Sequence, residues 1–264
     1  MLLQIEDLDV SFRNEEGAAT AAAMDVNLTL ERGEVLGLVG ESGSGKSSVA
    51  MSIARLLPSP PAFWPKGRIL FDGVDTLKMP LPELRRIRGS RIGVVFQDPI
   101  GSLSPLHRIG DQLVETVRLH REVSAKTARE MALEWLQKVG IPDPEVRARA
   151  YPHELSGGMQ QRVMIAMGLM LDPDLLIADE PTTALDVTIQ AQVLKLMKRL
   201  IAAKSAVLLI THDLGVVSQM ATKLAVMRAG RVIETADDPA AFFDNPQNPY
   251  SQMLVGEARR MELE

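Results

Sequence analysis

The chain has 264 residues, a formal net charge of −5 and a hydrophobic content of 46%. A chain of this length and composition is typical of a globular protein with a substantial core, which excludes a disordered or fibrous one. The negative balance disfavours a nucleic-acid partner, and the absence of cysteine excludes disulfides, zinc ribbons and cysteine-ligated iron–sulfur clusters.

The amino-terminal segment, residues 1–10, carries acidic residues and does not resemble a signal peptide. The richest apolar run, residues 163–171, is far shorter than the roughly 18 apolar residues that cross a bilayer. We therefore expect a cytoplasmic chain that reaches a membrane only through a partner.

Residues 1–32, 67–75 and 224–234 alternate apolar and polar side chains. Turn signals such as Asp72-Gly73 and Ala229-Gly230 interrupt them. Alternation of this kind is typical of antiparallel strands that bury one face. These segments are expected to form an antiparallel β-subdomain that flanks a parallel core.

Three short apolar runs, residues 33–40, 175–178 and 206–210, end in glycine or are followed by polar residues. They suit central parallel strands buried on both faces, whose carboxyl ends present ligand-contacting residues. A helix-compatible stretch, residues 46–57, follows the first run. The pattern predicts an α/β fold with a mainly parallel central sheet.

Between about residues 98 and 155 the sequence is helical in character. Ser124 is expected to cap a helix that Gly140 and Pro142 end. The apolar face of this helix is formed by Ala128, Met131, Ala132, Trp135, Leu136 and Val139. The stretch indicates an α-helical subdomain inserted into the core.

The whole chain, residues 1–264, is interpreted as one domain. Its core and antiparallel β-subdomain take residues 1–97 and 172–240, and its helical subdomain takes residues 98–171. The short carboxyl-terminal segment, residues 241–264, begins with a run rich in Asn and Pro and is expected to lie on the surface.

Residues 40–47, Gly-Glu-Ser-Gly-Ser-Gly-Lys-Ser, fit the phosphate-binding pattern G-x-x-x-x-G-K-[ST]. Glycines allow successive backbone N–H groups to converge on an anion at a helix N-terminus. Lys46 would reach the terminal phosphates, and the Ser47 hydroxyl would ligate Mg²⁺. An ordinary Gly/Ser loop is the alternative, but the position between a strand and a helix favours phosphate binding.

Residues 175–180, Leu-Leu-Ile-Ala-Asp-Glu, end an apolar strand in two carboxylates. Asp179 suits a water-mediated contact to Mg²⁺, and Glu180 suits orienting or deprotonating an attacking water. An acidic pair that merely faces solvent is the alternative. Together with the phosphate-binding loop, the catalytic interpretation is preferred.

Residues 155–162, Leu-Ser-Gly-Gly-Met-Gln-Gln-Arg, place Ser156 as an N-cap and leave the helix end unobstructed at Gly157 and Gly158. A capped core helix with glycines for close packing is the alternative. The segment resembles the signature motif of ATP-binding cassette (ABC) ATPases. It stands shortly before the strand that ends in Asp179 and Glu180, as it does in that family.

Further positions then match the family. Gln97 resembles the glutamine of the Q-loop, residues 183–186 (Thr-Ala-Leu-Asp) resemble the D-loop, and His212 resembles the switch histidine. Phe12 is the candidate aromatic that stacks on adenine, with a core role as the alternative. Such a family member has a P-loop NTPase core.

The resemblance implies a set of site residues. Catalytic roles fall on Lys46, Gln97, Glu180 and His212, and the Mg²⁺ ligands would be Ser47, Gln97 and Asp179. The positions that would contact ATP are Phe12, Gly40, Glu41, Ser42, Gly43, Ser44, Gly45, Lys46, Ser47, Ser48, Gln97, Ser156, Gly157, Gly158 and Asp186.

Within the family the chain is most similar to the ATPases of dipeptide, oligopeptide and nickel importers. This likeness rests on residues 97–105, 151–156 and 248–250. The last of these resembles a His-Pro-Tyr motif with Asn248 in place of His. The chain also lacks the cysteine-bearing extension of some longer peptide-importer relatives, which leaves room for a nickel or metal-chelate importer.

The resemblance implies partners as well. They are a second ABC ATPase subunit, identical or different, membrane permease subunits, and indirectly an extracytoplasmic substrate-binding protein. No nucleic acid is expected. The chain would act as a peripheral subunit at the cytoplasmic face of the inner membrane.

A soluble ABC ATPase that acts as a mechanical clamp in DNA repair or translation is the alternative. Its usual features, long coiled coils, zinc-binding cysteines or two cassettes in one chain, are not visible in the sequence. A nucleotide-dependent scaffold without hydrolysis is a further one, and Glu180 and His212 count against it.

Overall fold

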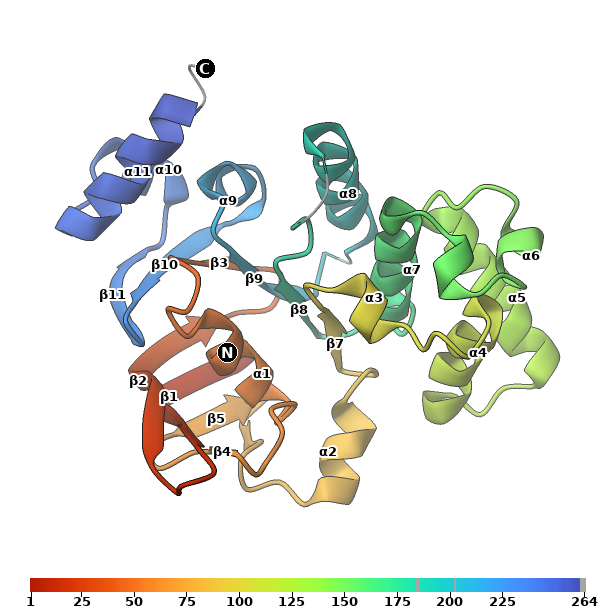
Figure 1. Ribbon diagram of the computed structural model, residues 1–264, viewed down its shortest axis with the longest axis horizontal. Helices are drawn as coiled ribbons and strands as arrows, with labels where there is room; N and C mark the ends of the chain where they lie inside the picture. Colours follow the sequence, from red (N-terminus) through yellow and green to blue (C-terminus); the bar gives the residue numbers. More distant parts are fainter. Residues whose placement is uncertain (184–185, 202, 262–264) are drawn as a thin grey trace. The chain divides into compact units, whose positions relative to one another are not determined.

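The computed structural model describes residues 1–183, 186–201 and 203–261. The chain forms two compact units (Figure 1), one of Met1–Leu84 with Ala206–Glu264 and the other of Arg85–Ser205. Among the residues that the structure describes, no helix combines the length and the hydropathy that a membrane span requires. The expected α/β class is confirmed, whereas the subdomain bounds at 98–171 stay a prediction.

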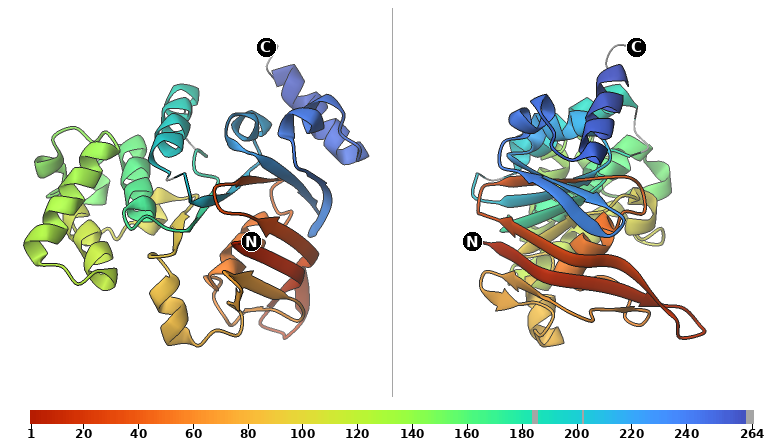
Figure 2. Two further views of the ribbon diagram at one scale, coloured as in Figure 1. Left: turned by 180° about the vertical axis from the view of Figure 1, so that it is seen from behind. Right: turned by 90° about the vertical axis from the view of Figure 1, so that its left-hand side faces the viewer.

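The first unit contains an antiparallel sheet in the order β2-β1-β5-β6, with β4 also pairing with β1. Its strands are β1 (Leu3–Arg13), β2 (Ala19–Leu30), β4 (Ala62–Phe63), β5 (Arg68–Phe71) and β6 (Val74–Asp75). The long strands β1 and β2 lie side by side (Figure 2) and pair from Leu3–Leu30 to Arg13–Ala19. Their alternating side chains bury one face, as the sequence predicts.

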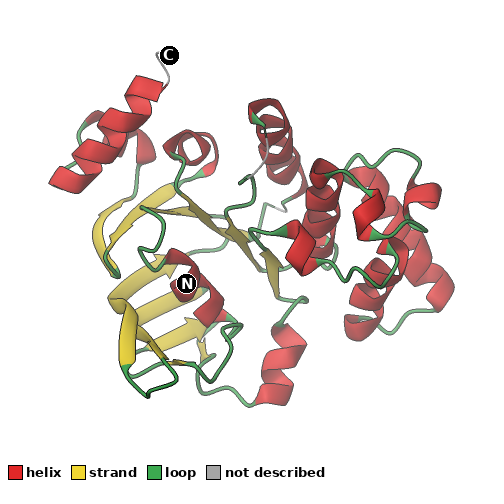
Figure 3. Ribbon diagram, in the orientation of Figure 1, coloured by secondary structure: helices red, strands yellow, loops and turns green. Residues whose placement is uncertain are grey.

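The same unit holds four strands of the core sheet in the order β11-β10-β3-β9 (yellow in Figure 3). They are β3 (Val35–Val39), β9 (Ala206–Thr211), β10 (Lys223–Arg228) and β11 (Arg231–Ala236). Strand β3 runs parallel to both β9 and β10. Every residue of β9 is buried, which is typical of a central parallel strand.

The expectation for residues 224–234 needs correction. Only β11 is antiparallel, to β10, whereas β10 runs parallel to β3 and extends the core sheet. Strand β10 buries consecutive residues, Leu224 to Met227, on both faces. A continuous buried run of this kind belongs to a parallel strand, which the reading of an alternating pattern missed.

Helices complete the first unit. They are α1 (Lys46–Ile53), α9 (Leu214–Met220), α10 (Pro239–Asp244) and α11 (Pro249–Met261). The expectation that the carboxyl-terminal segment lies on the surface holds for its Asn- and Pro-rich run, where Asn245 and Gln247 are exposed, but not for the helices on either side of it. Phe242, Tyr250 and Val255 are each only 3% exposed and pack into a core cluster with residues of β3, α9 and β10.

The second unit contains one parallel strand pair, β7 (Ile92–Val95) and β8 (Leu175–Asp179), among its described residues. Its helices are α3 (Pro99–Ser102), α4 (Ile109–His120), α5 (Ala125–Lys138), α6 (Pro144–Arg147), α7 (Gly157–Leu169) and α8 (Val187–Leu200). Helix α2 (Leu81–Ile87) spans the chain boundary between the units.

The predicted helix after Ser124 is confirmed as α5. The Ser124 hydroxyl accepts a hydrogen bond from the backbone N–H of Thr127, which satisfies one orphan donor of the first turn. Trp135 and Leu136 are buried on the predicted apolar face. The chain leaves the helix at Gly140, whose φ of 75° suits glycine.

Candidate functional site

The phosphate-binding loop joins β3 to α1 in the first unit. Strand β3 ends at Val39 and α1 begins at Lys46. Gly45, at a φ of 101°, takes the N-cap position, and no side chain in the described ranges caps this helix end. Because the first N–H groups of a helix lack intrahelical partners, this end offers donors and a positive dipole to an anion.

Two glycines of the loop are required by close backbone contacts. A Cβ built on Gly40 would lie 2.0 Å from the Met227 carbonyl oxygen, and one on Gly45 would lie 2.2 Å from the Ala22 carbonyl oxygen. The backbones of β10 and β2 therefore wall the loop on these sides. Any side chain at either position would displace the loop.

Lys46 lies inside the loop and is only 4% exposed. Its Nζ donates to the carbonyl oxygens of Gly40 and Glu41, both at 2.8 Å, and to Ser44 Oγ at 3.4 Å. These contacts compensate the cost of burying an ammonium group. They fix a positive charge beside the helix end that would receive phosphate.

His212 lies at the same sheet edge as the loop. The parallel register pairs Val39 with Thr211, so His212 and Gly40 each follow directly from paired residues of neighbouring strands. Asp213 caps α9 by accepting the N–H of Gly215 at 2.8 Å. The structure therefore brings His212 to the edge that carries the loop, as expected for carboxyl ends of parallel strands.

Phe12 is half-buried in β1 and pairs with Thr20 of β2. Two positions further along β2, Ala22 forms the wall against Gly45. Phe12 is therefore one strand away from the phosphate-binding loop. Its role against adenine stays a prediction.

The second unit brings Gln97 and Glu180 together. They follow β7 and β8, whose register pairs Val95 with Ala178. Gln97 Nε2 donates to Glu180 Oε2 at 3.0 Å, and Thr183 Oγ1 donates to the same oxygen at 2.8 Å. These two hydrogen bonds orient the carboxylate that is the candidate base.

The backbone at Glu180 is unusual. Its φ of 44° is in the left-handed region, which costs a residue with a side chain about 1–3 kcal/mol. Asp179, the last residue of β8, is 6% exposed. The sharp change of direction after Asp179 separates a buried carboxylate from a half-buried one at the end of the same strand.

The signature segment opens α7 in the second unit. Ser156 Oγ accepts the Met159 N–H at 3.4 Å, which confirms the predicted cap. Gly157 is exposed, and a Cβ built on it would meet nothing within 4 Å. Buried Gln160 supports the turn before the helix through its bonds to the carbonyls of Pro152 and Leu155. The helix end is well built and unobstructed.

Part of the predicted D-loop, Ala184 and Leu185, lies outside the described residues. Asp186 is exposed and caps α8, with its Oδ1 accepting the Ile189 N–H at 2.9 Å. A nucleotide contact from Asp186 stays a prediction, and its observed contact is that of an ordinary helix cap.

Sequence reasoning missed one residue at the loop. The backbone N–H of Glu41 donates to the hydroxyl of Tyr250, 3.1 Å away, from the carboxyl-terminal helix α11. A signal was present in the sequence, because Tyr250, Leu254 and Ala258 recur at helical spacing and mark an apolar face.

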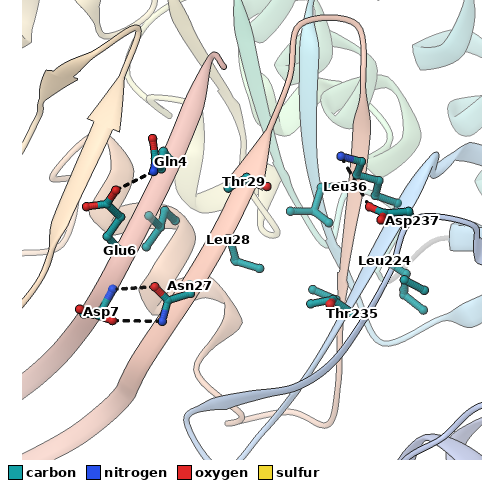
Figure 4. Close-up of a pocket in the computed structure, with 14 residues that line it drawn as sticks. Gln4, Glu6, Asp7, Asn27, Leu28, Thr29, Leu36, Leu224, Thr235 and Asp237 are labelled. Atoms are coloured by element: carbon teal, nitrogen blue, oxygen red, sulfur yellow. Dashed lines mark hydrogen bonds and ion pairs between the residues drawn. The ribbon is translucent and has the colours of Figure 1, made fainter.

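A separate hollow of about 530 Å³ lies in the first unit, lined by residues of β1, β2, β3, β10 and β11 (Figure 4). Asp7 and Asn27 bond each other there through side chains, and the amine of Lys223 lies 3.7 Å from Asp237. Because none of the predicted site residues lies there, the hollow is not the candidate site.

The sequence of this chain matches a known protein family. A family model described as "ABC transporter" matches residues 23–183. The chain belongs to the ABC transporter family, as an ATP-binding cassette. The resemblance drawn from the signature segment is thereby confirmed.

Two curated relatives illustrate the likeness. This cassette is 47% identical over 262 residues to the oligopeptide transport ATP-binding protein OppD of Bacillus subtilis, covering 99% of the chain and 73% of the relative. It is 51% identical over 256 residues to the peptidoglycan transport ATP-binding protein YejF of Agrobacterium fabrum. That match covers 96% of the chain and 46% of YejF, so the cassette spans about half of that relative.

A solved structure supports the fold of this cassette. The ATP-binding cassette MJ0796, in a dimeric post-hydrolysis state bound to ADP and Pi, matches with a TM-score of 0.78 and 29% identity. The match covers 88% of this chain and 97% of MJ0796. The P-loop NTPase core expected from the sequence is confirmed.

Proposed function

We propose that this cassette is the ATP-hydrolysing subunit that energises an ABC importer of peptides. The observation that carries the proposal is the phosphate-binding loop itself. Its buried Lys46 is the first residue of a helix whose end has no side-chain cap, and Gly40 and Gly45 allow no larger residue. A polyphosphate suits this arrangement because it offers negative charge to the lysine and acceptors to the N–H groups.

The loop supplies binding, and other groups supply hydrolysis. Ser47 with Gln97 and Asp179 would hold Mg²⁺, which neutralises charge on the phosphates when bound. Glu180, oriented by Gln97 and Thr183, would accept a proton from the attacking water. His212 would contact the terminal phosphate from the edge that it shares with the loop.

One chain holds only half of each ATP site in this proposal. The exposed segment Ser156–Gly158 would complete the nucleotide site of a second cassette, identical or different. Two observations support it. Ser156 caps the start of α7 and Gly157 leaves that helix end open, and the MJ0796 relative is dimeric. ATP would then favour the paired state by binding it more tightly than the separated one.

The cargo follows from relatives. OppD of Bacillus subtilis carries the name of an oligopeptide transport protein, and DppD of the same organism that of a dipeptide transport protein. We propose peptides for this cassette, with nickel or metal-chelates as the second cargo class. Permease subunits at the cytoplasmic face of the inner membrane, fed by an extracytoplasmic binding protein, would select it.

A mechanical clamp on DNA or ribosomes is disfavoured. The curated relatives at 47–51% identity are named as transport proteins or as components of ABC transporters, and their matches cover nearly all of this chain. No sequence feature of the clamp class adds weight on the other side.

The test is coupled transport in proteoliposomes. The cassette is purified with its permease, reconstituted, and assayed for ATP hydrolysis with and without a peptide-loaded binding protein. Peptide-dependent stimulation that Lys46→Ala abolishes is the expected result. Hydrolysis that no peptide stimulates, together with stimulation by a nickel-loaded binding protein, would move the proposal to the metal class.

A further inference from the structure

The phosphate-binding loop is held from outside by the carboxyl-terminal helix. The peptide unit between Gly40 and Glu41 has both polar groups engaged. Its carbonyl, on Gly40, accepts from Lys46 Nζ at 2.8 Å, and its N–H, on Glu41, donates to the Tyr250 hydroxyl at 3.1 Å. The first turn of the loop is therefore fixed between an internal lysine and a residue 209 positions away.

The tyrosine is itself fixed on every side. Tyr250 is 3% exposed, and its ring lies under the guanidinium of Arg228, 4.5 Å from the ring centroid. Its backbone N–H donates to Asn248 Oδ1 at 2.9 Å. A stacked cation and a capped backbone leave the hydroxyl little freedom, so it presents one defined position to the loop.

The segment that carries the tyrosine is tied back to the core sheet. Glu234 of β11 accepts the backbone N–H groups of Gln247 and Asn248 at 2.8 and 2.9 Å. Phe242 and Val255 pack beside Tyr250 in the same buried cluster. Helices α10 and α11 are thus packed and hydrogen-bonded against the core of the first unit, which places Tyr250 beside the loop.

The phenol remains protonated in neutral solution. Burial raises the pKa of Tyr250 above its usual range, and the neighbouring Glu41 carboxylate raises it further. The hydrogen bond from the Glu41 N–H and, to a smaller extent, the charge of Arg228 act in the opposite direction without cancelling this rise. A neutral hydroxyl keeps a lone pair for the Glu41 N–H and a proton for a second hydrogen bond.

We infer that Tyr250 is a positioning residue of the ATP site, which orients the Gly40–Glu41 peptide and thereby sets the nucleotide affinity of the loop. The inference rests on the proposed function and deepens it. Without the hydroxyl, the Glu41 N–H loses its acceptor at a half-buried place, and the carbonyl that accepts from Lys46 loses its fixed orientation. The carboxyl-terminal helices then act on ATP binding without touching ATP.

The competing explanation is that Tyr250 serves only to pack the core. Removal of its hydroxyl oxygen distinguishes this packing role from the positioning role. Tyr250→Phe keeps the ring, its burial and its stacking under Arg228, and removes only the oxygen. A packing role predicts an unchanged affinity for ATP. A positioning role predicts weaker binding, because only the hydrogen bond has been lost.

The experiment is equilibrium titration of the full-length cassette with a fluorescent ATP analogue, beside ATP turnover with its partner subunits. Tyr250→Phe is expected to raise the dissociation constant about three- to tenfold, the range for one lost hydrogen bond. Turnover at saturating ATP is expected to stay near the wild-type rate. The matched control is Tyr151→Phe, the same change at the other tyrosine of the chain, in the second unit.

Several results would overturn the inference. They are an unchanged dissociation constant in Tyr250→Phe, whatever its melting temperature, and an equal weakening in Tyr151→Phe. Failure of the wild-type cassette to bind ATP would remove the proposed function and this inference together. Normal wild-type binding with an unaffected Tyr250→Phe would remove the inference alone.

Discussion

The phosphate-binding loop and the signature helix end differ in how the protein holds them. In the loop, the carbonyl groups of Gly40 and Glu41 hold Lys46. The loop backbone is enclosed by carbonyl groups from β2 and β10 and bonded by the hydroxyl of Tyr250. At the start of α7, Ser156 caps the helix, but Gly157 meets nothing on its open side.

The phosphate-binding loop is therefore fully supported by its own unit, whereas the start of α7 is left open to a ligand or partner. The loop has its supporting groups within its own unit, so its shape is set before any partner binds. The signature end is capped by Ser156, yet Gly157 has no packing reason to be glycine within the described residues. In our proposal a glycine is needed there because an open helix end can approach a phosphate held by another chain.

The largest expected effect is that of Glu180→Gln. The amide keeps an oxygen that can accept from Gln97 and Thr183, so the fold should be unchanged, whereas proton acceptance is lost. Turnover should fall about 10²–10⁴-fold while ATP binding is retained. Phosphate release measured with the partner subunits checks this, and Glu122→Gln, at an exposed carboxylate of the same unit, is the control.

Gly45→Ala should disturb the enclosed phosphate-binding loop. The new Cβ would lie 2.2 Å from the Ala22 carbonyl oxygen, so the loop must move. We expect at least about a tenfold loss of ATP affinity, since the overpacking adds about 1–3 kcal/mol to the backbone strain.

Gly17→Ala is the matched control for this change. Gly17 also has a positive φ, 85°, but a Cβ there meets nothing within 4 Å. It should lose about 1–2 kcal/mol of stability through strain alone and keep its ATP affinity. Equal affinities in the two variants would show that the wall against Gly45 does not shape the loop.

Gly157→Ala should block the open helix end at the start of α7. A Cβ has free space in the single chain, so the melting temperature and the ATP affinity of the isolated cassette should be unchanged. In the paired state the methyl group meets the partner's nucleotide, and turnover should fall about tenfold or more, as for overpacking of about 1–3 kcal/mol. A variant with full turnover beside its partner would place the shared site elsewhere.

The smallest expected effect concerns Glu234, behind the loop. Burial raises the pKa of this carboxyl, but the Ser251 hydroxyl and the N–H groups of Gln247 and Asn248 outweigh it, so the pKa lies below its usual range. A lowered folded-state pKa stabilises the protein above the unfolded-state value of about 4.3, and that stabilisation is lost as pH falls through the folded-state value.

Melting curves of wild type and Glu234→Gln measure this effect. The wild type should be more stable by a few degrees at neutral pH, and the difference should shrink below about pH 4.3. A difference that stays constant to lower pH would mean that the carboxylate charge is not what holds the segment.

The phosphate-binding loop and the helix N-caps were predictable from local sequence. The apolar run before Gly40 and the helix after Lys46 are determined by neighbouring residues, and the N-caps at Ser124 and Ser156 need only one hydroxyl and the turn that follows. Local preferences and the global fold agree at these positions, which is why pattern alone located them.

What escaped prediction depends on distant pairing. The direction of β10 is set by its pairing with β3, nearly two hundred residues earlier. The turn at Ala229-Gly230 indicates only that β10 pairs antiparallel with β11. The Asn- and Pro-rich approach to α11 resembles a surface linker, yet Asn248 caps the helix that buries Tyr250. Only the apolar spacing within α11 could have indicated that this helix packs.

If one chain holds half of each ATP site, Glu180→Gln, which binds ATP without hydrolysing it, should pair with a second cassette. Its molar mass is measured by light scattering with and without Mg-ATP, alone and mixed with its partner cassette. We expect an ATP-dependent rise to the mass of a pair, which the added substitution Gly157→Ala abolishes. If the mass stays that of one chain while ATP binding is demonstrated in the same mixture, the two cassettes do not share their ATP sites.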